Sequence, residues 1–232
     1  MNSGPSDTSA PILTLDGVDL KLKSASGEVH ILKNIHLALP CSKTVSVVGP
    51  SGSGKTTLLM VLSGLEKPTS GGVTVAGQRI DLMDEDALAS FRRDNIGIVF
   101  QNFHLIPTMN ALENVAIPLE FAGDKDAFEK AALALESVGL KERVTHYPGQ
   151  LSGGEQQRVA LARAFVTAPK IILADEPTGN LDAETGEKVM RILFDLAKKN
   201  GTTLIFVTHD ATLAARCDMT VKIRDGRIEN EK

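Results

Sequence analysis

The first forty residues carry short apolar runs broken by polar turns, which predicts antiparallel β-structure. The apolar positions fall at 12–15, 18–22 and 35–39, with Asp16-Gly17 and the stretch 24–27 between them. Short runs rich in Val, Leu and Ile between turn residues are typical of strands. We therefore expect three short strands at the start of the fold.

A buried strand and a glycine-rich loop follow. The run TVSVV at 44–48 is almost wholly apolar, and it leads through glycines into a helix expected from about Gly54 to Gly64. Strand, glycine loop and helix in this order form the context of a phosphate-binding loop. A further β pair is expected at about 73–80, after Gly71-Gly72.

The middle of the chain is mainly helical. Helices are expected at 111–115 and 126–138, inside an inserted α-helical subdomain that spans about 90–165 and includes a strand candidate at 96–99. Apolar side chains spaced three or four residues apart predict the buried face of the second helix. That face is formed by Phe128, Ala132, Leu135 and Val138.

Strands and helices alternate over the last third of the chain. Asp182 suits an N-cap and Gly201 suits the position after a helix end. Alternating β and α units predict a largely parallel sheet. We expect an α/β fold with a mainly parallel core sheet and an N-terminal antiparallel β subdomain, as one domain over 12–232 after a flexible tail at 1–11. The alternating elements are helices at 152–166, 183–199 and 211–216, and strands at 171–175, 203–207 and 219–224.

Composition narrows the classes of function. A formal net charge of -4 gives no general electrostatic attraction to nucleic acid or to an anionic membrane, so no nucleic-acid partner is expected. Cys41 and Cys217 form neither a disulfide framework nor a zinc motif. No apolar run approaches the roughly 20 residues that a membrane-spanning helix needs. A role at a membrane would therefore require another chain.

The glycine loop at 49–56 predicts a triphosphate site. Its glycines let backbone N–H groups approach phosphate oxygens closely. Lys55 would contact the β- and γ-phosphates, and the Thr56 hydroxyl would bind Mg²⁺. ATP and Mg²⁺ are thus the expected ligands, and the alternative is a chance Gly/Ser loop. The candidate ATP contacts here are Gly49, Ser51, Gly52, Ser53, Gly54, Lys55, Thr56 and Thr57.

Polar groups at three strand ends are candidates for catalysis, because ligands of α/β sheets bind there. Asp175 is assigned to Mg²⁺, and Glu176 to the attacking water as general base. Gln101 would contact Mg²⁺ and the water, and His209 would bind the γ-phosphate and align Glu176. The alternatives are a helix-stabilising acidic pair, a surface glutamine and an ordinary histidine.

A second glycine turn precedes a helix at Ser152-Gly153-Gly154. A helix N-terminus offers free N–H groups and a positive dipole end to phosphate. The chain thus has two anion-binding segments but one lysine-bearing loop. We expect a two-fold homodimer in which each nucleotide contacts Lys55 of one subunit and Ser152 of the other. The alternative is that the turn is an ordinary helix cap.

Five motifs in this order resemble the ATP-binding subunit of an ABC transporter, and they extend over most of the chain. The sequence of residues 100–118 and the DEPTGNLD motif resemble those of the branch that contains LolD, MacB and FtsE, and especially those of YbbA-like subunits. The motifs are GPSGSGKT at 49–56, VFQ at 99–101, LSGGEQQRVALARA at 151–164, ILADEPTGNLD at 172–182 and VTHD at 207–210.

The resemblance implies roles and partners. It makes Gln101 the Q-loop residue, Ser152, Gly153 and Gly154 the signature contacts, Asp182 an ATP-site aspartate acting across the dimer, and His209 the switch histidine. It implies a separate YbbP-, MacB- or LolC-like permease and a place on the cytoplasmic face of the inner membrane. The cargo of this branch is lipids, lipoproteins or hydrophobic compounds, and an envelope esterase is left open as a further partner.

One departure from the family concerns the base. The family stacks adenine on an early aromatic residue, but Leu22 stands at that place and no aromatic precedes Phe91. Either an aliphatic contact or His30 substitutes, or affinity and the preference for ATP over GTP fall.

The apolar cluster at 100–106, which contains Phe100, Phe103, His104, Leu105 and Ile106, is either a socket for a permease helix or packing within the helical insertion.

Two other functions are alternatives to a transporter subunit. A chromosome or DNA-repair ATPase would share the phosphate motifs but would need a long coiled coil, and a regulatory subunit with little turnover would not need Glu176 and His209.

Overall fold

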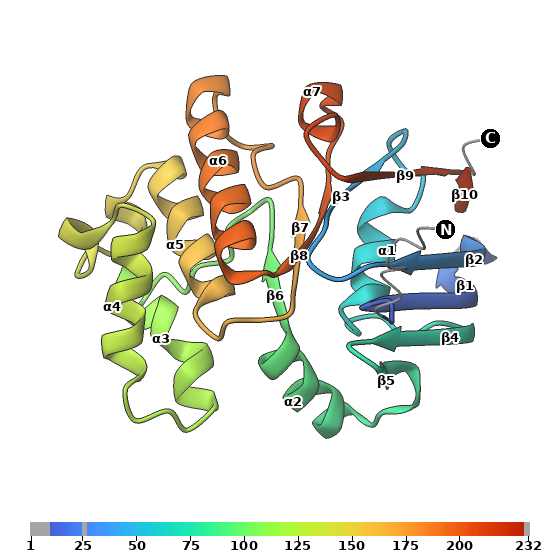
Figure 1. The fold of residues 1–232 in the computed structure, drawn as a ribbon, viewed down its shortest axis with the longest axis horizontal. Helices are drawn as coiled ribbons and strands as arrows, with labels where there is room; N and C mark the ends of the chain where they lie inside the picture. The colour runs from blue at the N-terminus through green and yellow to red at the C-terminus, as the bar shows by residue number, and fades with distance from the viewer. Residues whose placement is uncertain (1–9, 25–26, 230–232) are drawn as a thin grey trace, which may run out of the picture.

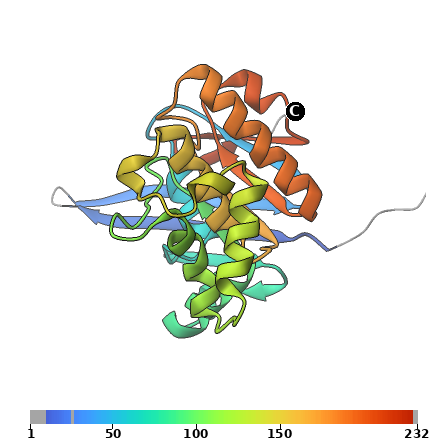
Figure 2. The same ribbon diagram turned by 90° about the vertical axis from the view of Figure 1, so that its left-hand side faces the viewer.

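The computed structural model describes residues 10–24 and 27–229, which form two sheets and a helical lobe. Figure 1 shows the antiparallel sheet at the right, the second sheet in the middle, and α3 (Ala111–Phe121) and α4 (Ala127–Ser137) at the left. In Figure 2 these two helices face the viewer. None of the described helices is long and apolar enough to cross a bilayer.

The core sheet is parallel except at one edge. Its order is β10-β9-β3-β8-β7-β6, and only β10 runs antiparallel to its neighbour. This confirms the predicted α/β class. The strands are β3 (Thr44–Val48), β6 (Ile96–Val99), β7 (Ile171–Asp175), β8 (Thr203–Val207), β9 (Met219–Arg224) and β10 (Arg227–Glu229).

Both faces of the parallel sheet are buried, which explains its nearly continuous apolar strands. Leu173 and Ile205 pack on the side of α1 (Lys55–Leu62), whereas Ile172 and Leu204 pack on the side of α5 (Gly153–Phe165) and α6 (Ala183–Asn200). The remaining helices are α2 (Glu85–Asn95) and α7 (Ala211–Ala214). Helix α1 lies between the two sheets, because its apolar residues share one core with both.

The first sheet corrects a prediction. Two separate strands were expected at 12–15 and 18–22, but β1 (Leu13–Ser24) continues through Asp16-Gly17 and pairs with β2 (Gly27–Leu39). Register shifts between Leu15 and Val18 absorb the turn-like dipeptide as a bulge. The sheet order is β2-β1-β4-β5, with β4 at Ser70–Val75 and β5 at Gln78–Arg79. Of the expected tail, residues 1–9 lie outside the described residues.

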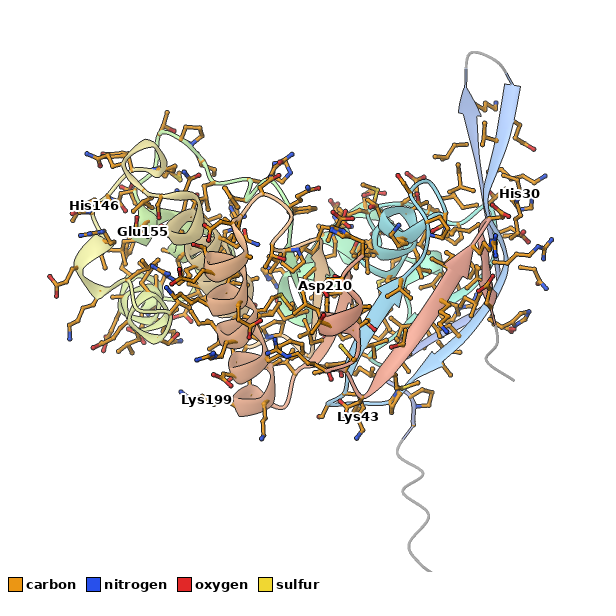
Figure 3. The ribbon with its side chains drawn as sticks, turned by 90° about the horizontal axis from the view of Figure 1, so that it is seen from above. His30, Lys43, His146, Glu155, Lys199 and Asp210 are labelled. Atoms are coloured by element: carbon orange, nitrogen blue, oxygen red, sulfur yellow. The ribbon has the colours of Figure 1, made fainter. Side chains whose placement is uncertain are left out.

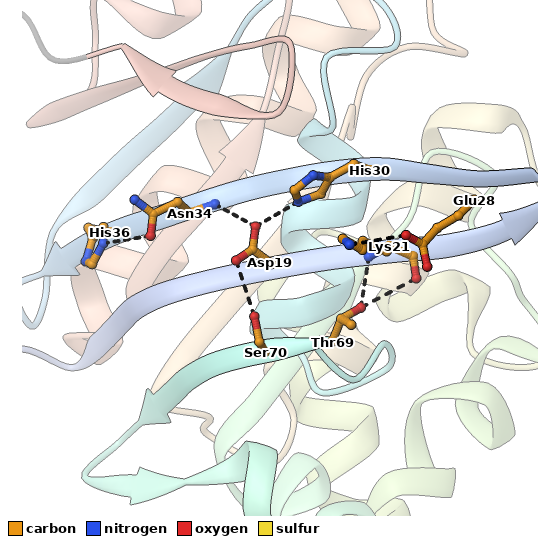
Figure 4. Close-up of polar contacts among 8 residues, drawn as sticks. All are labelled: Asp19, Lys21, Glu28, His30, Asn34, His36, Thr69 and Ser70. Atoms are coloured by element: carbon orange, nitrogen blue, oxygen red, sulfur yellow. Dashed lines mark hydrogen bonds and ion pairs between the residues drawn. The ribbon is translucent and has the colours of Figure 1, made fainter.

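Asp19 fastens three strands of this sheet (Figure 4). One carboxylate oxygen accepts hydrogen bonds from His30 Nε2 at 2.7 Å and from the Asn34 N–H at 3.0 Å, and the other accepts one from Ser70 Oγ at 3.2 Å. The Asn34 and His30 hydrogen bonds lower the pKa of Asp19. The β1–β2 hairpin, which carries Leu22, is therefore tied to β4.

The helical lobe also corrects two expectations. Helix α3 runs to Phe121, six residues beyond the predicted end. In α4 the buried face consists of Ala127, Ala131 and Leu135, followed by Val138, whereas Phe128 is 47% exposed. Small alanines allow α3 and α5 to pack close to α4, and this leaves the larger ring outside. The expected 90–165 segment contains β6 of the core sheet as well as these helices.

Candidate ATP site

The glycine loop joins β3 to α1 and is held in place by tight backbone packing. At Gly49, a Cβ atom would lie 2.0 Å from the carbonyl oxygen of Ile223 in β9, so no other residue fits without moving the backbone. The Gly226 N–H donates to the Ser53 carbonyl at 3.1 Å. The loop is thus positioned by the strand pair β9–β10 as well as by its own helix.

Lys55 is nearly buried and points back into the loop. Its Nζ donates to the carbonyl oxygens of Gly49 at 3.0 Å and Pro50 at 2.8 Å. Both acceptors are neutral carbonyl groups, and Asp175 lies close enough for the Lys55 charge to oppose the rise in the pKa of that carboxyl. Ser53 Oγ is buried and has no partner among the described residues. A cation and an unpaired hydroxyl inside a glycine loop fit a phosphate group.

Thr56 and Asp175 place two oxygen atoms of the kind that bind metal ions side by side. Thr56 Oγ1 donates to Asp175 Oδ1 at 3.2 Å. Burial raises the pKa of Asp175, the Thr56 hydrogen bond opposes that shift, and the Glu176 charge adds to it. No group of three or more His, Cys, Asp or Glu side chains within 10–24 and 27–229 could hold a metal. Mg²⁺ usually takes one or two protein oxygens together with phosphates and water, and this pair fits that pattern.

Glu176 and His209 come together at the ends of β7 and β8, which pair in register from Ile171 to Asp175. His209 Nδ1 lies 3.6 Å from Glu176 Oε1. Glu176 has φ 42°, in the left-handed region that residues other than glycine seldom adopt. Such backbone strain is common at functional sites, where the surrounding structure maintains it.

Gln101, at the end of β6, contacts the loop that follows β7. Its Nε2 donates to Asn180 Oδ1 at 3.4 Å, and Asn180 Nδ2 donates back to the Gln101 carbonyl at 3.0 Å. A Cβ on Gly179 would lie 2.7 Å from Gln101 Nε2 and 3.3 Å from Glu176 Oε2. The Gln101 amide and the Glu176 carboxylate therefore flank one glycine. Sequence reasoning missed Asn180, although the DEPTGNLD motif contains it.

The Ser152 turn caps α5. Ser152 Oγ accepts from the Glu155 N–H, and Glu155 Oε2 accepts from the Ser152 N–H at 2.8 Å. The Ser152 N–H and the Arg143 guanidinium hold the pKa of Glu155 below its usual value. Ser152 itself is exposed. The turn is thus a capping box at an accessible helix N-terminus, so the cap does not exclude an anion site.

Helix α5 is locked to the loop that follows β7. Gln157 Nε2 donates to the Pro177 carbonyl at 2.7 Å, and the Gln157 side chain is fully buried. A Cβ on Gly154 would lie 2.3 Å from Thr185 Cγ2 in α6. Asp182 caps α6 by accepting from the Thr185 N–H at 3.0 Å. Sequence reasoning missed Gln157, whose role depends on this tertiary contact.

The two anion-binding segments remain apart within one chain. Across the described residues, no hydrogen bond or ion pair joins 49–57 to Ser152, Gly153 or Gly154. Figure 3 shows Glu155, next to that turn, in the helical lobe, while Asp210, next to His209, lies over the parallel sheet. Lys55, Thr56, Asp175, Glu176 and His209 form one cluster, and the Ser152 turn forms another.

Comparison with known proteins identifies the family. The family model described as ABC transporter matches residues 32–179, more than half of the chain. The ABC transporter ATP-binding protein YbbA of Escherichia coli K12 is 50% identical over 206 residues, which cover 88% of this chain and 90% of YbbA. The chain belongs to the ABC transporter family. It is therefore an ATP-binding subunit with ATPase activity, related to the YbbA and LolD subunits.

Two further ABC proteins extend this comparison. LolD, the ATP-binding protein of a lipoprotein-releasing system in Geobacter metallireducens, is 49% identical over 218 residues. The aligned region covers 92% of this chain and 97% of LolD. The cassette MJ0796, in a dimeric structure of a post-hydrolysis state bound to ADP and Pi, matches with a TM-score of 0.87 and 41% identity. That match covers 95% of this chain and 97% of MJ0796, and it confirms the ABC ATPase fold.

Proposed function

We propose that two copies of this chain form two composite ATP sites, with an ABC ATPase domain that spans 12–232. The observation that carries the proposal is the separation of the Lys55 loop and the Ser152 turn within one chain. Each turn ends at an accessible helix N-terminus, where phosphate is favoured. The dimeric arrangement of the related MJ0796 cassette supports pairing of the Lys55 loop with the partner's Ser152 turn.

The residues of the first cluster divide the chemistry of hydrolysis. The glycine loop and Lys55 bind the phosphates, while Thr56, Asp175 and Gln101 provide oxygens for Mg²⁺, which would neutralise phosphate charge when bound. Glu176 accepts a proton as water attacks the γ-phosphorus and the bond to the ADP oxygen breaks. His209, 3.6 Å from Glu176, positions that carboxylate and contacts the γ-phosphate. Asp182, at the N-cap of α6, is proposed to contact the ATP site across the dimer.

An aliphatic pair is proposed to contact the base. Leu22 and Val29 face each other across the β1–β2 hairpin, and they are 38% and 44% exposed. His30 follows Val29 in β2 and pairs with Lys21, so its side chain points to the face of the hairpin opposite Leu22 and Val29. Aliphatic contact lacks the stacking that an aromatic ring gives, about 1–3 kcal/mol per base in single-strand binders. Preference for ATP over GTP is expected to be modest.

A groove between the parallel sheet and the helical lobe is the proposed docking site of the permease. Its volume is about 400 Å³, and Phe100, Ile117 and Phe121 line it. Phe121 is 78% exposed, as expected of a surface that awaits a partner. The predicted cluster at 100–106 divides, because Phe100 faces this groove whereas Leu105 packs in the helical lobe.

Arg163 links this docking groove to the segment after Gln101. It donates to the carbonyl oxygens of Phe103 at 2.8 Å and His104 at 2.7 Å, and burial lowers its pKa. Movement of a partner helix in the groove would therefore displace residues 101–104. We place the subunit at the cytoplasmic face of the inner membrane, bound to a YbbP-, MacB- or LolC-like permease.

The cargo we propose is lipids, lipoproteins or hydrophobic compounds at the cell envelope. The names of the related LolD, a lipoprotein-releasing protein, and MacB, a macrolide exporter, support this range. In this architecture the permease holds the substrate path, and this subunit supplies motion. We also propose an envelope esterase as a further partner.

The test is the variant Glu176→Gln with MgATP. Because the amide cannot accept the proton, hydrolysis should fall at least about a hundredfold, the upper range for a positioned base being about 10⁴. ATP should stay bound and the protein should elute as a dimer in size-exclusion chromatography. Adding Ser152→Glu, which places a negative charge at the partner's phosphates, should return it to monomer. A Glu176→Gln variant that stays monomeric and hydrolyses ATP rapidly would refute the composite site.

A further inference from the structure

A second hollow lies at the opposite end of α1 from the phosphate loop. It encloses about 340 Å³, within the size range of ligand pockets. Its apolar walls come from α1, β4, the turn after β5, and α2: Val61, Val73, Ile80, Met83 and Leu88. None of these residues belongs to the proposed ATP site, so this hollow is separate from that site.

The second hollow, called the acidic cavity from here on, is lined by several negatively charged side chains. Glu66, Asp84 and Glu85 line it together with Lys67. Asp81, also at the rim, is engaged by Arg79 and the Val73 N–H. Within the described chain, the carboxylates of Glu66 and Glu85 make no hydrogen bond or ion pair. Unpaired carboxylates over an apolar floor favour an occupant that is both apolar and basic.

Exposed apolar side chains extend the cavity toward the docking groove. Leu65, which is 49% exposed, lines both hollows. Leu82, which stands in the sequence between the lining residues Asp81 and Met83, is 73% exposed. Helix α2 connects them, because Leu88 lines the cavity and Arg92, one turn later, lines the groove. The two hollows are therefore neighbours on one continuous surface.

The docking groove has the opposite charge. Arg92, Arg93 and Arg163 line it, and none of the described residues in its lining is an Asp or a Glu. Asp94 neutralises Arg93, whereas Arg92 donates to the Gly64 carbonyl at 2.9 Å and Arg163 donates to the Phe103 and His104 carbonyls. A protein of net charge -4 thus separates its charges sharply along α2. Opposite charges on adjacent apolar hollows select the partner's charge pattern.

We propose that the acidic cavity receives an apolar side chain of the membrane partner that is accompanied by a Lys or Arg, beside the segment held in the groove. This rests on the proposed function, because it takes the occupant from the same permease. The cavity anchors the basic part of the partner and fixes its orientation across α2. Since Val61 and Gly64 belong to or follow α1, the anchor bears on the helix that begins at Lys55.

The test uses two synthetic 14-residue helical peptides with the same Leu and Phe positions, one with two Lys and one with two Glu. Methyl-labelled protein is titrated with each at about 0.15 M salt. The Lys peptide should shift the methyl signals of Val61, Val73, Ile80 and Leu88 and bind about fivefold tighter than the Glu peptide, as two partly exposed ion pairs allow. Signals of Ile98 and Ile117 report binding in the groove instead.

Neighbouring residues of α2 supply a matched control. Glu85 lines the cavity and Asp86 does not, although both carboxylates lie in the first turn of the helix. Glu85→Lys should weaken the Lys peptide about fivefold, whereas Asp86→Lys should change its Kd by less than about twofold because salt screens the more distant charge. Both variants lose the same helix-dipole interaction, so equal thermal stabilities verify the comparison.

Three results would overturn the proposal. Equal binding of the two peptides would remove the charge selectivity, and equal effects of the two variants would remove the cavity as the site. Cavity shifts produced by dodecyltrimethylammonium but by neither peptide would assign the hollow to a small amphiphilic cation. The ATPase assay and the Glu176→Gln dimer test do not involve this surface, so failure here is distinguishable from failure of the proposed function.

Discussion

Lys55 shows how a loop can keep a charged side chain close to its ligand site. Its ammonium group donates to two carbonyl oxygens of its own loop. Phosphate oxygens carry negative charge, so they compete well for the same three N–H donors. The loop thus keeps the cation near the phosphate position without neutralising it.

Lys55→Met should therefore weaken MgATP binding while leaving the fold intact. Loss of charge-assisted hydrogen bonds, about 1.5–3 kcal/mol each, predicts a Kd at least about tenfold higher, because about 1.4 kcal/mol is one decade. A fluorescent ATP analogue measures this. The control is Lys188→Met on α6, an exposed lysine paired with Glu184. Similar affinities for both variants would contradict the role of Lys55.

The motif residues could be predicted from sequence because phosphate chemistry fixes their type and spacing. Glycines, a lysine and a hydroxyl must stand close together in the chain for a loop to enclose phosphate. Gln157 and Asn180 could not be assigned in this way. Each forms a hydrogen bond to a segment at least 20 residues away, Gln157 with Pro177 and Asn180 with Gln101, and only the fold brings those segments together.

At the scale of the element, α4 shows why helical periodicity gave only part of its buried face. The pattern placed Leu135 and Val138 correctly but chose Phe128 and Ala132 instead of Ala127 and Ala131. Alanine carries little apolar weight in a sequence pattern, yet it decides how closely two helices approach. Likewise, α3 continues past the predicted end and contains Pro118, although the missing N–H of proline removes one hydrogen bond within the helix.

Two alanine substitutions in α4 test this assignment. Leu135 is fully buried, so Leu135→Ala should reduce the free energy of unfolding by about 2–5 kcal/mol. Phe128→Ala removes a larger side chain from a half-exposed position and should cost less than about 1.5 kcal/mol. Urea denaturation followed by circular dichroism measures both. The reverse order would restore the face predicted from sequence.

The contact between α5 and α6 gives another test at this scale. A methyl group on Gly154 would lie 2.3 Å from Thr185 Cγ2, whereas one on Gly153 would meet Leu181 Cδ2 at 3.4 Å, an ordinary contact distance. Gly154→Ala should therefore destabilise the protein by about 1–3 kcal/mol, as overpacking does.

Gly153→Ala is the matched control, because it makes the same chemical change one residue earlier in the same helix. Its unfolding free energy should stay within about 1 kcal/mol of the wild type, since alanine is the better helix former. Differential scanning calorimetry of the pair separates the two positions. If both variants melt at the same temperature, α5 and α6 are not packed as closely as the Gly154 contact requires.

At the scale of the whole molecule, the layers follow from which faces had to be buried. Strands β7 and β8 are apolar on both sides because α1 covers one face and α5 and α6 cover the other. That could be predicted from alternation of strands and helices. The position of the helical lobe could not, because it depends on contacts such as Gln157 to Pro177 between distant segments. In the proposed dimer, each Lys55 cluster would meet the partner's Ser152 turn.

The two cysteines report whether this packing holds in solution. Cys41 is exposed, while Cys217 is partly covered beside α7, where its Sγ–H contacts the Leu213 carbonyl at 3.6 Å. Burial raises the pKa of Cys217 to about 11. Because the thiolate is the reactive form, only about one Cys217 thiol in a thousand is ionised at pH 8. Titration with Ellman's reagent should show one fast thiol and one at least about a hundredfold slower.

Raising the pH should speed the slow reaction about tenfold per unit until pH approaches 11, since the thiolate fraction rises by that factor below the pKa. Cys41→Ser should remove the fast phase and leave the slow one. In denaturant both thiols of the wild type should react quickly, because unfolding exposes Cys217 and returns its pKa to the ordinary range. Two equally fast thiols in the native protein would show that α7 and β9 do not cover Cys217.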